Sequence, residues 1–164
     1  MDKAFLVEQL TTKIRESLGV AEREMTVAAD AARDGEDAKE RREDTRMAIE
    51  YSALAKGQER RAQAAHMALS QLETFRPGPI AKGGKVEMGA LIEIEEEESG
   101  EGRTLFLAPV GAGIELTGPD GDGFLSVVTP SSPIGRAAWG RKLGDSIDVT
   151  VEGNTRTWEI TWVG

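Results

Sequence analysis

The chain has 164 residues, 39% of them hydrophobic but only 5% aromatic, so two small domains are a better expectation than one large core. The formal net charge is −9 and falls mostly on the second half of the chain, because residues 1–76 are nearly balanced. An acidic second half disfavours direct contact with a nucleic-acid backbone and favours a basic protein partner.

The first part of the chain predicts two long helices. From Lys3 to about Arg33, and again from about Ala38 to Phe75, apolar residues recur every three or four positions. Each run has one narrow apolar stripe, so we expect the two to pack as an antiparallel helical hairpin, a coiled coil over residues 1–76. The expected stripes are Leu6, Leu10, Ile14, Leu18, Ala21, Met25, Ala28 and Ala32, and then Met47, Tyr51, Leu54, Ala62, Ala65, Leu69 and Leu72.

Residues 77–85, PGPIAKGGK, predict a linker, because prolines and glycines end the helical pattern. Residues 86–164 then predict a small antiparallel sheet, since short apolar or alternating runs are separated by glycine-rich turns. One short helix is expected at Ile134–Trp139, with Ser132 as N-cap and Pro133 in the first helical position. The expected strands are Ala90–Glu95, Arg103–Ala108, Phe124–Val128, Ser146–Val151 and Thr157–Val163.

Several single residues have an ordinary structural interpretation. We expect Met25, Met67 and the three tryptophans in the core, and His66 on the polar face of the second helix. The run Glu95–Glu98 is interpreted as the solvated end of a strand and its turn rather than a cation site. A prolyl isomerase pocket is not expected, because the five aromatic residues of the second half should lie mostly in the core. They are Phe106, Phe124, Trp139, Trp158 and Trp162.

Some features are absent from the sequence. There is no cysteine, which excludes disulfides and thiolate metal sites. No apolar run approaches the roughly 18 residues of a membrane span, and the first ten residues, MDKAFLVEQL, lack the apolar core of a signal peptide. We therefore expect a cytoplasmic protein without a membrane partner.

The stretch 129–149, TPSSPIGRAAWGRKLGDSIDV, resembles the signature of the Gre (GreA/GreB) transcript-cleavage factors. The order of parts is also similar, with a helical hairpin, a linker and a small sheet domain, so the resemblance covers nearly the whole chain. The matching positions are Ser132, Pro133, Gly135, Arg136, Ala137, Gly140, Gly144 and Asp145, with Trp139 where the family usually has a leucine-like residue.

This resemblance implies a fold, a partner and a mode of action. The fold would be α+β, a coiled-coil hairpin followed by an FKBP-like sheet domain. Gre factors seat the sheet domain at the rim of the secondary channel of bacterial RNA polymerase and direct the coiled coil, tip first, toward the active centre. The protein would thus be a monomer without its own enzymatic activity, and DNA binding would be a family property. The implied polymerase-binding residues are Ser132, Pro133, Gly135, Arg136 and Trp139.

The tip, residues 33–44 with the sequence RDGEDAKERRED, is similar to the family pattern at Asp37 and Glu40. In Gre factors two such carboxylates help to hold a catalytic Mg²⁺ of the polymerase while it hydrolyses backtracked RNA. Their i, i+3 spacing places both on one side of a helical turn, and hard oxygen ligands suit Mg²⁺. The resemblance implies that Asp37 and Glu40 act as catalytic and metal-binding residues on a shared Mg²⁺, with only indirect contact to RNA or nucleotide.

The tip also differs from the family pattern. Glu36 stands as an extra residue directly before Asp37, and Arg41 and Arg42 add positive charge. Two versions of the function therefore remain open: stimulation of transcript cleavage, or occupation of the channel without promoting cleavage. From a different class, the chain could be a protein-interaction module unrelated to transcription. The structural alternative for Asp37 and Glu40 is a solvated helix start that the helix dipole favours.

Overall fold

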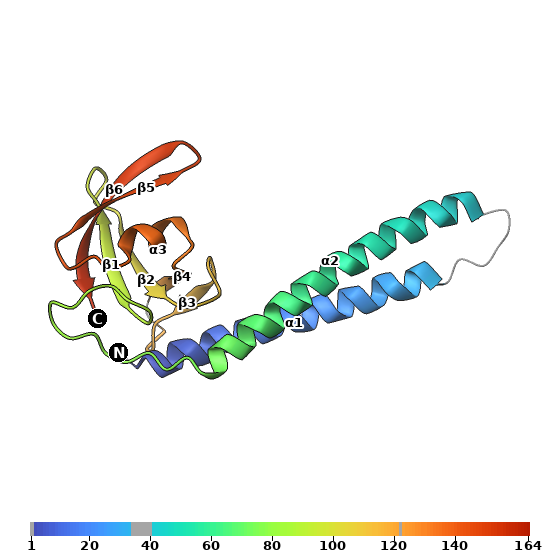
Figure 1. Cartoon of the computed structure of the whole chain (residues 1–164), viewed down its shortest axis with the longest axis horizontal. Helices are drawn as coiled ribbons and strands as arrows, with labels where there is room; N and C mark the ends of the chain where they lie inside the picture. The colour runs from blue at the N-terminus through green and yellow to red at the C-terminus, as the bar shows by residue number, and fades with distance from the viewer. Residues whose placement is uncertain (1, 34–40, 122) are drawn as a thin grey trace. The chain divides into compact units, whose positions relative to one another are not determined.

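The computed structural model describes residues 2–33, 41–121 and 123–164. Two long helices are followed by a mixed sheet with one short helix, which confirms the α+β class (Figure 1). The chain divides into two compact units, Thr11–Ser70 and the combination of Met1–Leu10 with Gln71–Gly164. None of the described helices is both long and apolar enough to cross a membrane.

The helical hairpin consists of α1, Lys3–Arg33, and α2, Arg41–Glu73, which run antiparallel beside each other (Figure 1). On α1 the expected stripe is confirmed, because Ile14, Ala21 and Ala28 are buried and Leu18 and Met25 are half-buried. The side chain of Ala32 lies outside the described part of the chain. Within the Thr11–Ser70 unit, the apolar stripe of α1 is therefore continuous and largely buried.

The stripe on α2 differs from the expected one. Leu54 is 50% exposed and Met47 is 47% exposed, so both were wrongly assigned to the buried face. At these two places the less exposed residue is the next one, Ala48 or Ala55, and such small residues allow two helices to approach closely. The other expected members of the stripe are confirmed. Its least exposed members follow alternating steps of three and four, at Ala48, Tyr51, Ala55, Gln58, Ala62, Ala65, Leu69 and Leu72.

Ala62→Asp should destabilise the hairpin by about 2–4 kcal/mol, because it places an unpaired carboxylate at a position that is only 7% exposed. Gln63→Asp is the matched control, since the adjacent Gln63 is exposed and the same charge there remains in water. Leu54→Asp should be equally mild. Thermal melting followed by the circular-dichroism signal of the helices measures the difference. Equal melting temperatures for Ala62→Asp and Gln63→Asp would show that the buried face of α2 is misassigned.

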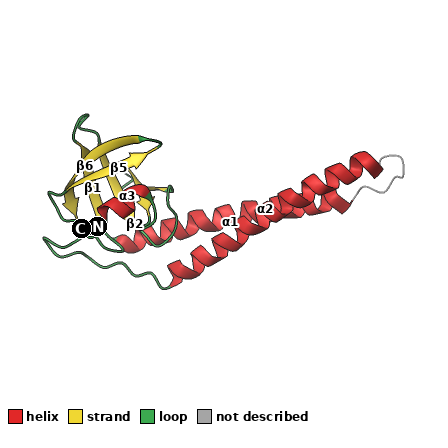
Figure 2. Cartoon of the chain, turned by 45° about the horizontal axis from the view of Figure 1, so that its top comes forward, coloured by secondary structure: helices red, strands yellow, loops and turns green. Residues whose placement is uncertain are grey.

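The described strands form one six-stranded sheet in the order β3-β4-β2-β1-β6-β5, with α3 packed against it (Figure 2). Four neighbouring pairs are antiparallel, as expected, but β2 and β4 are parallel. The expectation missed β3, a three-residue strand between glycine-rich turns, whose hairpin with β4 lets the chain return beside β2 in the parallel sense. The elements are β1 Leu91–Glu96, β2 Gly102–Leu107, β3 Glu115–Thr117, β4 Phe124–Val128, α3 Pro133–Ala138, β5 Ser146–Val151 and β6 Asn154–Val163.

The core of the sheet unit combines strand residues with α3. Trp158, Ile94 and Ile160 are almost fully buried, and Ala138 of α3 joins the same cluster. The first turns of α1 belong to this unit as well, because Leu6 and Leu10 are fully buried there. Apolar burial from sheet, short helix and helix start thus stabilises one compact body.

Gln9 of α1 pairs with the edge strand β3. Its Oε1 accepts a hydrogen bond of 2.8 Å from the Thr117 N–H, and its Nε2 donates one of 3.1 Å to the Thr117 carbonyl. A sheet edge with unpaired backbone groups invites unwanted strand pairing. The glutamine side chain therefore satisfies part of an edge that would otherwise be open.

The expectations for single aromatic and sulfur-containing residues were only partly correct. Trp158 is buried, whereas Trp139 is 46% and Trp162 43% exposed. Met67 is 66% and Phe124 76% exposed, so neither belongs to the core. Amphipathic and apolar side chains are common on protein surfaces, and residue type alone does not determine burial.

His66 and Glu96 are titratable residues whose exposure the sequence analysis predicted. His66 is exposed on the polar face of α2, as expected, with its Nε2 3.5 Å from Glu22 Oε1. Glu96 is buried rather than solvated, which corrects the expectation for the acidic run. Its carboxylate accepts a hydrogen bond from the Ser99 hydroxyl, and its Oε1 lies 3.6 Å from Arg156 Nε. These partners compensate for the burial of the charge.

Candidate functional site

Ser132 and Pro133 shape the start of helix α3. The Ser132 hydroxyl accepts hydrogen bonds of 3.3 Å from the Gly135 N–H and 3.1 Å from the Thr129 N–H, and donates one of 2.8 Å to the Thr129 carbonyl. Pro133 occupies the first helical position, where its missing N–H is not needed. The predicted N-cap is confirmed, and these two residues fix the backbone conformation at the start of α3.

Gly135 is required by close packing. It is buried, and a Cβ atom at this position would overlap the carbonyl oxygen of Thr129 and lie 2.8 Å from its carbonyl carbon. Because both are backbone atoms, they cannot rotate away as a side chain would. The glycine therefore allows α3 to pack directly against the preceding loop.

A second part of the motif fixes the turn before β5. The Asp145 carboxylate accepts a hydrogen bond of 2.9 Å from the Lys142 N–H, and the Asp145 N–H donates one of 3.0 Å to the Lys142 carbonyl. Between them Gly144 adopts φ 87°, a left-handed conformation that favours glycine. The turn thus holds its geometry through its own backbone and one carboxylate.

Three members of the predicted polymerase-binding set are exposed, Pro133, Arg136 and Trp139, and the last two carry large side chains. The Arg136 Nη2 donates a hydrogen bond of 3.1 Å to the Ser131 carbonyl, and its side chain is open to solvent. Trp139 ends α3, where its N–H donates to the Gly135 carbonyl at 3.0 Å while its indole is 46% exposed. A guanidinium and an exposed indole on a fixed helix are the residue types that dominate protein interfaces.

Leu143 was missed by the sequence reasoning. It follows in the same segment and is 55% exposed, although it is a large aliphatic residue. The signal in the sequence was a leucine isolated within the polar, glycine-containing stretch 140–146. Such a residue has no alternating or helical pattern to bury it, so its exposure is consistent with the sequence.

The predicted tip is mostly outside the described part of the chain. Asp37, Glu40 and Glu36 lie outside it, while Arg41 and Arg42 are the first residues of α2. Their roles stay predictions. Within the residues that the structure describes, no group of three or more His, Asp or Glu side chains is arranged to hold a metal ion.

Sequence comparisons place these features in a known family. The family model described as "Transcription elongation factor, GreA/GreB, C-term" matches residues 81–164, which include α3 and its cap. Transcription elongation factor GreA of Alkalilimnicola ehrlichii is 31% identical over 168 residues, covering 99% of this chain and 98% of the relative. GreA of Verminephrobacter eiseniae is 33% identical over 96 residues, so that match spans only 58% of this chain and 55% of the relative.

Two crystal structures are among the solved structures to which the chain is similar. GreA factor homolog 1 (Gfh1) of Thermus thermophilus is 17% identical, with 96% of this chain and 92% of that chain covered and a TM-score of 0.40. Gfh1 of Thermus aquaticus is 14% identical, with 95% and 92% covered and a TM-score of 0.41. From the family model over the sheet domain and the full-length similarity to GreA, the chain belongs to the GreA/GreB family of transcription elongation factors, which are not enzymes themselves.

Proposed function

We propose that this protein binds bacterial RNA polymerase at its secondary channel and places the tip of the helical hairpin near the polymerase active site to modulate elongation. The observation that carries the proposal is the similarity to a GreA along 99% of the chain, hairpin and sheet included. This family membership disfavours a module unrelated to transcription.

Docking through the sheet domain is supported by the exposed pair Arg136 and Trp139. Arg136 lies on α3 and Trp139 is its C-cap residue, and this helix is held at its start by the Ser132 cap and packs closely through Gly135. A rigid frame reduces the ordering cost of binding. The excess of negative charge in residues 77–164 suits a basic or mixed surface on the partner. That charge gives no support to direct DNA binding.

The tip of the hairpin would act at the polymerase active site. Asp37 and Glu40 would contribute carboxylate oxygens to a Mg²⁺ shared with the polymerase. Hard oxygen donors fit Mg²⁺, which readily completes its shell with ligands from a second molecule and water. When bound, Mg²⁺ would stabilise developing charge during RNA hydrolysis. The chain itself would bind the polymerase and orient the two carboxylates.

Cleavage of RNA in a stalled, backtracked elongation complex tests this function. Added protein should accelerate release of short 3′ fragments by the polymerase. A protein that neither binds the polymerase nor competes with a GreA for it would contradict the proposal. Measuring binding and cleavage in the same complexes separates the two halves.

A second candidate is a regulator that occupies the channel without promoting cleavage. The observation that favours it is the sequence of the tip, where Glu36 precedes Asp37 as an extra acid and Arg41 and Arg42 follow Glu40. A shift of one residue moves a carboxylate by about 3–4 Å, whereas metal ligation tolerates only a few tenths of an ångström. This regulator would compete with a GreA for polymerase and leave backtracked RNA uncut.

Trp139→Ala should weaken binding to RNA polymerase by about 30-fold, the effect of truncating an aromatic anchor at an interface. Phe124→Ala is the matched control, because Phe124 is an aromatic residue that is 76% exposed on β4, outside the α3 segment. Affinity is measured by competition against a labelled GreA, and circular dichroism checks that both variants fold. If both variants bind as the unmodified protein does, docking uses a different surface.

A further inference from the structure

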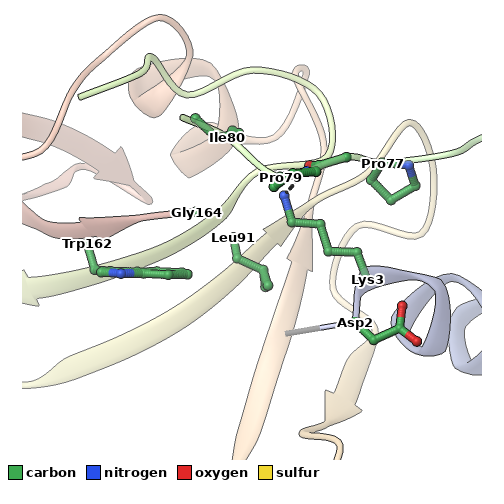
Figure 3. A pocket seen from close by; sticks show the side chains of 9 residues that line it. Asp2, Lys3, Pro77, Pro79, Ile80, Leu91, Trp162 and Gly164 are labelled. Carbon is green, nitrogen blue, oxygen red and sulfur yellow. Dashed lines mark hydrogen bonds between the residues drawn. The ribbon is translucent and has the colours of Figure 1, made fainter. Parts of the chain in front are cut away.

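A hollow beside the start of α1 contains a buried lysine that the proposed polymerase contacts do not use. Its volume is about 470 Å³, and it is lined by the first residues of α1, the segment after α2, strand β1 and the end of the chain after β6 (Figure 3). All of these belong to one compact unit. Its walls include Lys3, Pro77, Pro79, Ile80, Leu91 and Trp162.

Lys3 is only 6% exposed, although lysine is almost never buried without a charged partner. Its Nζ donates a hydrogen bond of 2.7 Å to the Gly78 carbonyl. The side chain extends toward Pro79, and the Asp2 carboxylate lies at its other end (Figure 3). That carboxylate instead accepts a hydrogen bond of 2.9 Å from the Ala4 N–H. No ion pair joins Lys3 to a carboxylate in the part of the chain that the structure describes.

The charge of Lys3 is therefore incompletely compensated. Burial lowers the pKa of Lys3 below its ordinary value, and the attraction of Glu87 offsets this effect only in part. An ammonium group has three N–H donors, and a neutral carbonyl such as that of Gly78 is a weaker partner than an anion. An anion in the hollow would supply the missing negative charge.

Apart from Asp2, whose carboxylate is bonded to the Ala4 N–H, the other side chains that line the hollow are apolar. Trp162 is 43% exposed and lies on the opposite side of Leu91 from Lys3 (Figure 3). Pro77, Pro79 and Ile80 add further apolar surface. An indole offers a flat face against which planar rings pack. The volume of about 470 Å³ lies within the range of roughly 300–1,000 Å³ that is typical of small-molecule sites.

We propose that this hollow binds a small organic anion, a carboxylate joined to a planar apolar body. The Lys3 ammonium would hold the carboxylate, and the body would pack between Trp162 and the prolines that follow α2. Because Lys3 also holds the Gly78 carbonyl, a bound anion would contact both the start of α1 and the segment that leads into the sheet. The site is separate from Arg136 and Trp139 and does not depend on the proposed function.

Indole-3-acetate is a suitable probe, because it joins a carboxylate to a planar ring. Titrated into the full-length protein, it should shift the indole N–H resonance of Trp162 with a Kd of about 1 mM, as expected for a fragment of this size. The neutral isostere indole-3-acetamide should bind at least about tenfold more weakly, because it lacks the charge-assisted hydrogen bond to Lys3. The cationic tryptamine should not compete.

Lys3→Gln should weaken indole-3-acetate binding by about tenfold and leave the weak acetamide binding unchanged. Lys82→Gln is the matched control, since Lys82 is an exposed lysine of the same linker and should not affect either ligand. The comparison of acid and amide uses the unmodified protein, so it decides the matter even where Lys3→Gln fails to fold. Equal binding of acid and amide, or no saturable shift at about ten times the expected Kd, would overturn the proposal.

Discussion

Gly135→Ala is expected to destabilise the sheet domain by about 3 kcal/mol or more, a large effect for the addition of one methyl group. The added Cβ would overlap the Thr129 carbonyl oxygen and approach the Ser132 hydroxyl to 2.9 Å. That hydroxyl accepts the capping hydrogen bond from the Gly135 N–H and makes two more to the Thr129 backbone, so relief of the overlap would also break the cap. Loss of an N-cap alone costs about 1 kcal/mol.

Gly57→Ala is the control for this prediction. Gly57 lies on α2 with open space around its Cα, so alanine there should stabilise the helix by up to about 1 kcal/mol. Urea unfolding monitored by tryptophan fluorescence measures Gly135→Ala, because Trp158 is buried in the sheet core and becomes exposed on unfolding, and the circular-dichroism signal of the helices measures Gly57→Ala. A Gly135→Ala protein as stable as the unmodified one would mean that the loop at Thr129 moves freely away from α3.

Features that local chemistry determines could be predicted from the sequence. Ser132 as N-cap and Pro133 in the first helical position predict the start of a helix, and α3 begins there. The bounds of α1, β4 and β5 also agree, since periodicity and turn residues mark them clearly. In each case residues close together in the chain are sufficient to determine the element.

Features that depend on distant contacts could not be predicted in the same way. The buried face of α2 runs along alanines such as Ala55 and Ala62, and the larger Leu54 beside them points to the wrong face. Strand β3 exists through pairing with β4, and its three residues carry too little pattern by themselves. The burial of Lys3 depends on the segment around Gly78, 75 positions away in the chain.

The predicted site divides along the same line. The cap, the close packing of Gly135 and the turn at Asp145 are confirmed as local geometry, and Arg136 and Trp139 are exposed beside them. Sequence similarity cannot separate residues that shape the backbone from residues that face a partner, because both are needed for the same surface. The structure shows which members of the set shape the backbone and which are exposed, and Arg136 and Trp139 are the two large exposed side chains on which the proposed contact with polymerase rests.

Asp37→Asn and Glu40→Gln should each reduce stimulated transcript cleavage by at least about 100-fold while leaving polymerase binding unchanged. The reason is that either change removes a charged ligand from the proposed shared Mg²⁺, whose electrostatic effect on the transition state amounts to several kcal/mol. The double variant should be little worse than either single variant, as for residues that act as a unit. Cleavage in backtracked complexes and competition with a GreA measure the two properties separately.

Mg²⁺ and the neighbouring Glu36 provide internal controls for this last prediction. Raising the Mg²⁺ concentration should partly restore each single variant, because a weakened site still fills by mass action. Deletion of Glu36 should bring the tip nearer to the family spacing and increase cleavage, if the extra acid is what displaces Asp37. The catalytic role would be contradicted if the unmodified protein displaces GreA but stimulates no RNA cleavage, and if Asp37→Asn changes neither result. The tip would then act by occupying the channel, with Arg41 and Arg42 as the charges to test next.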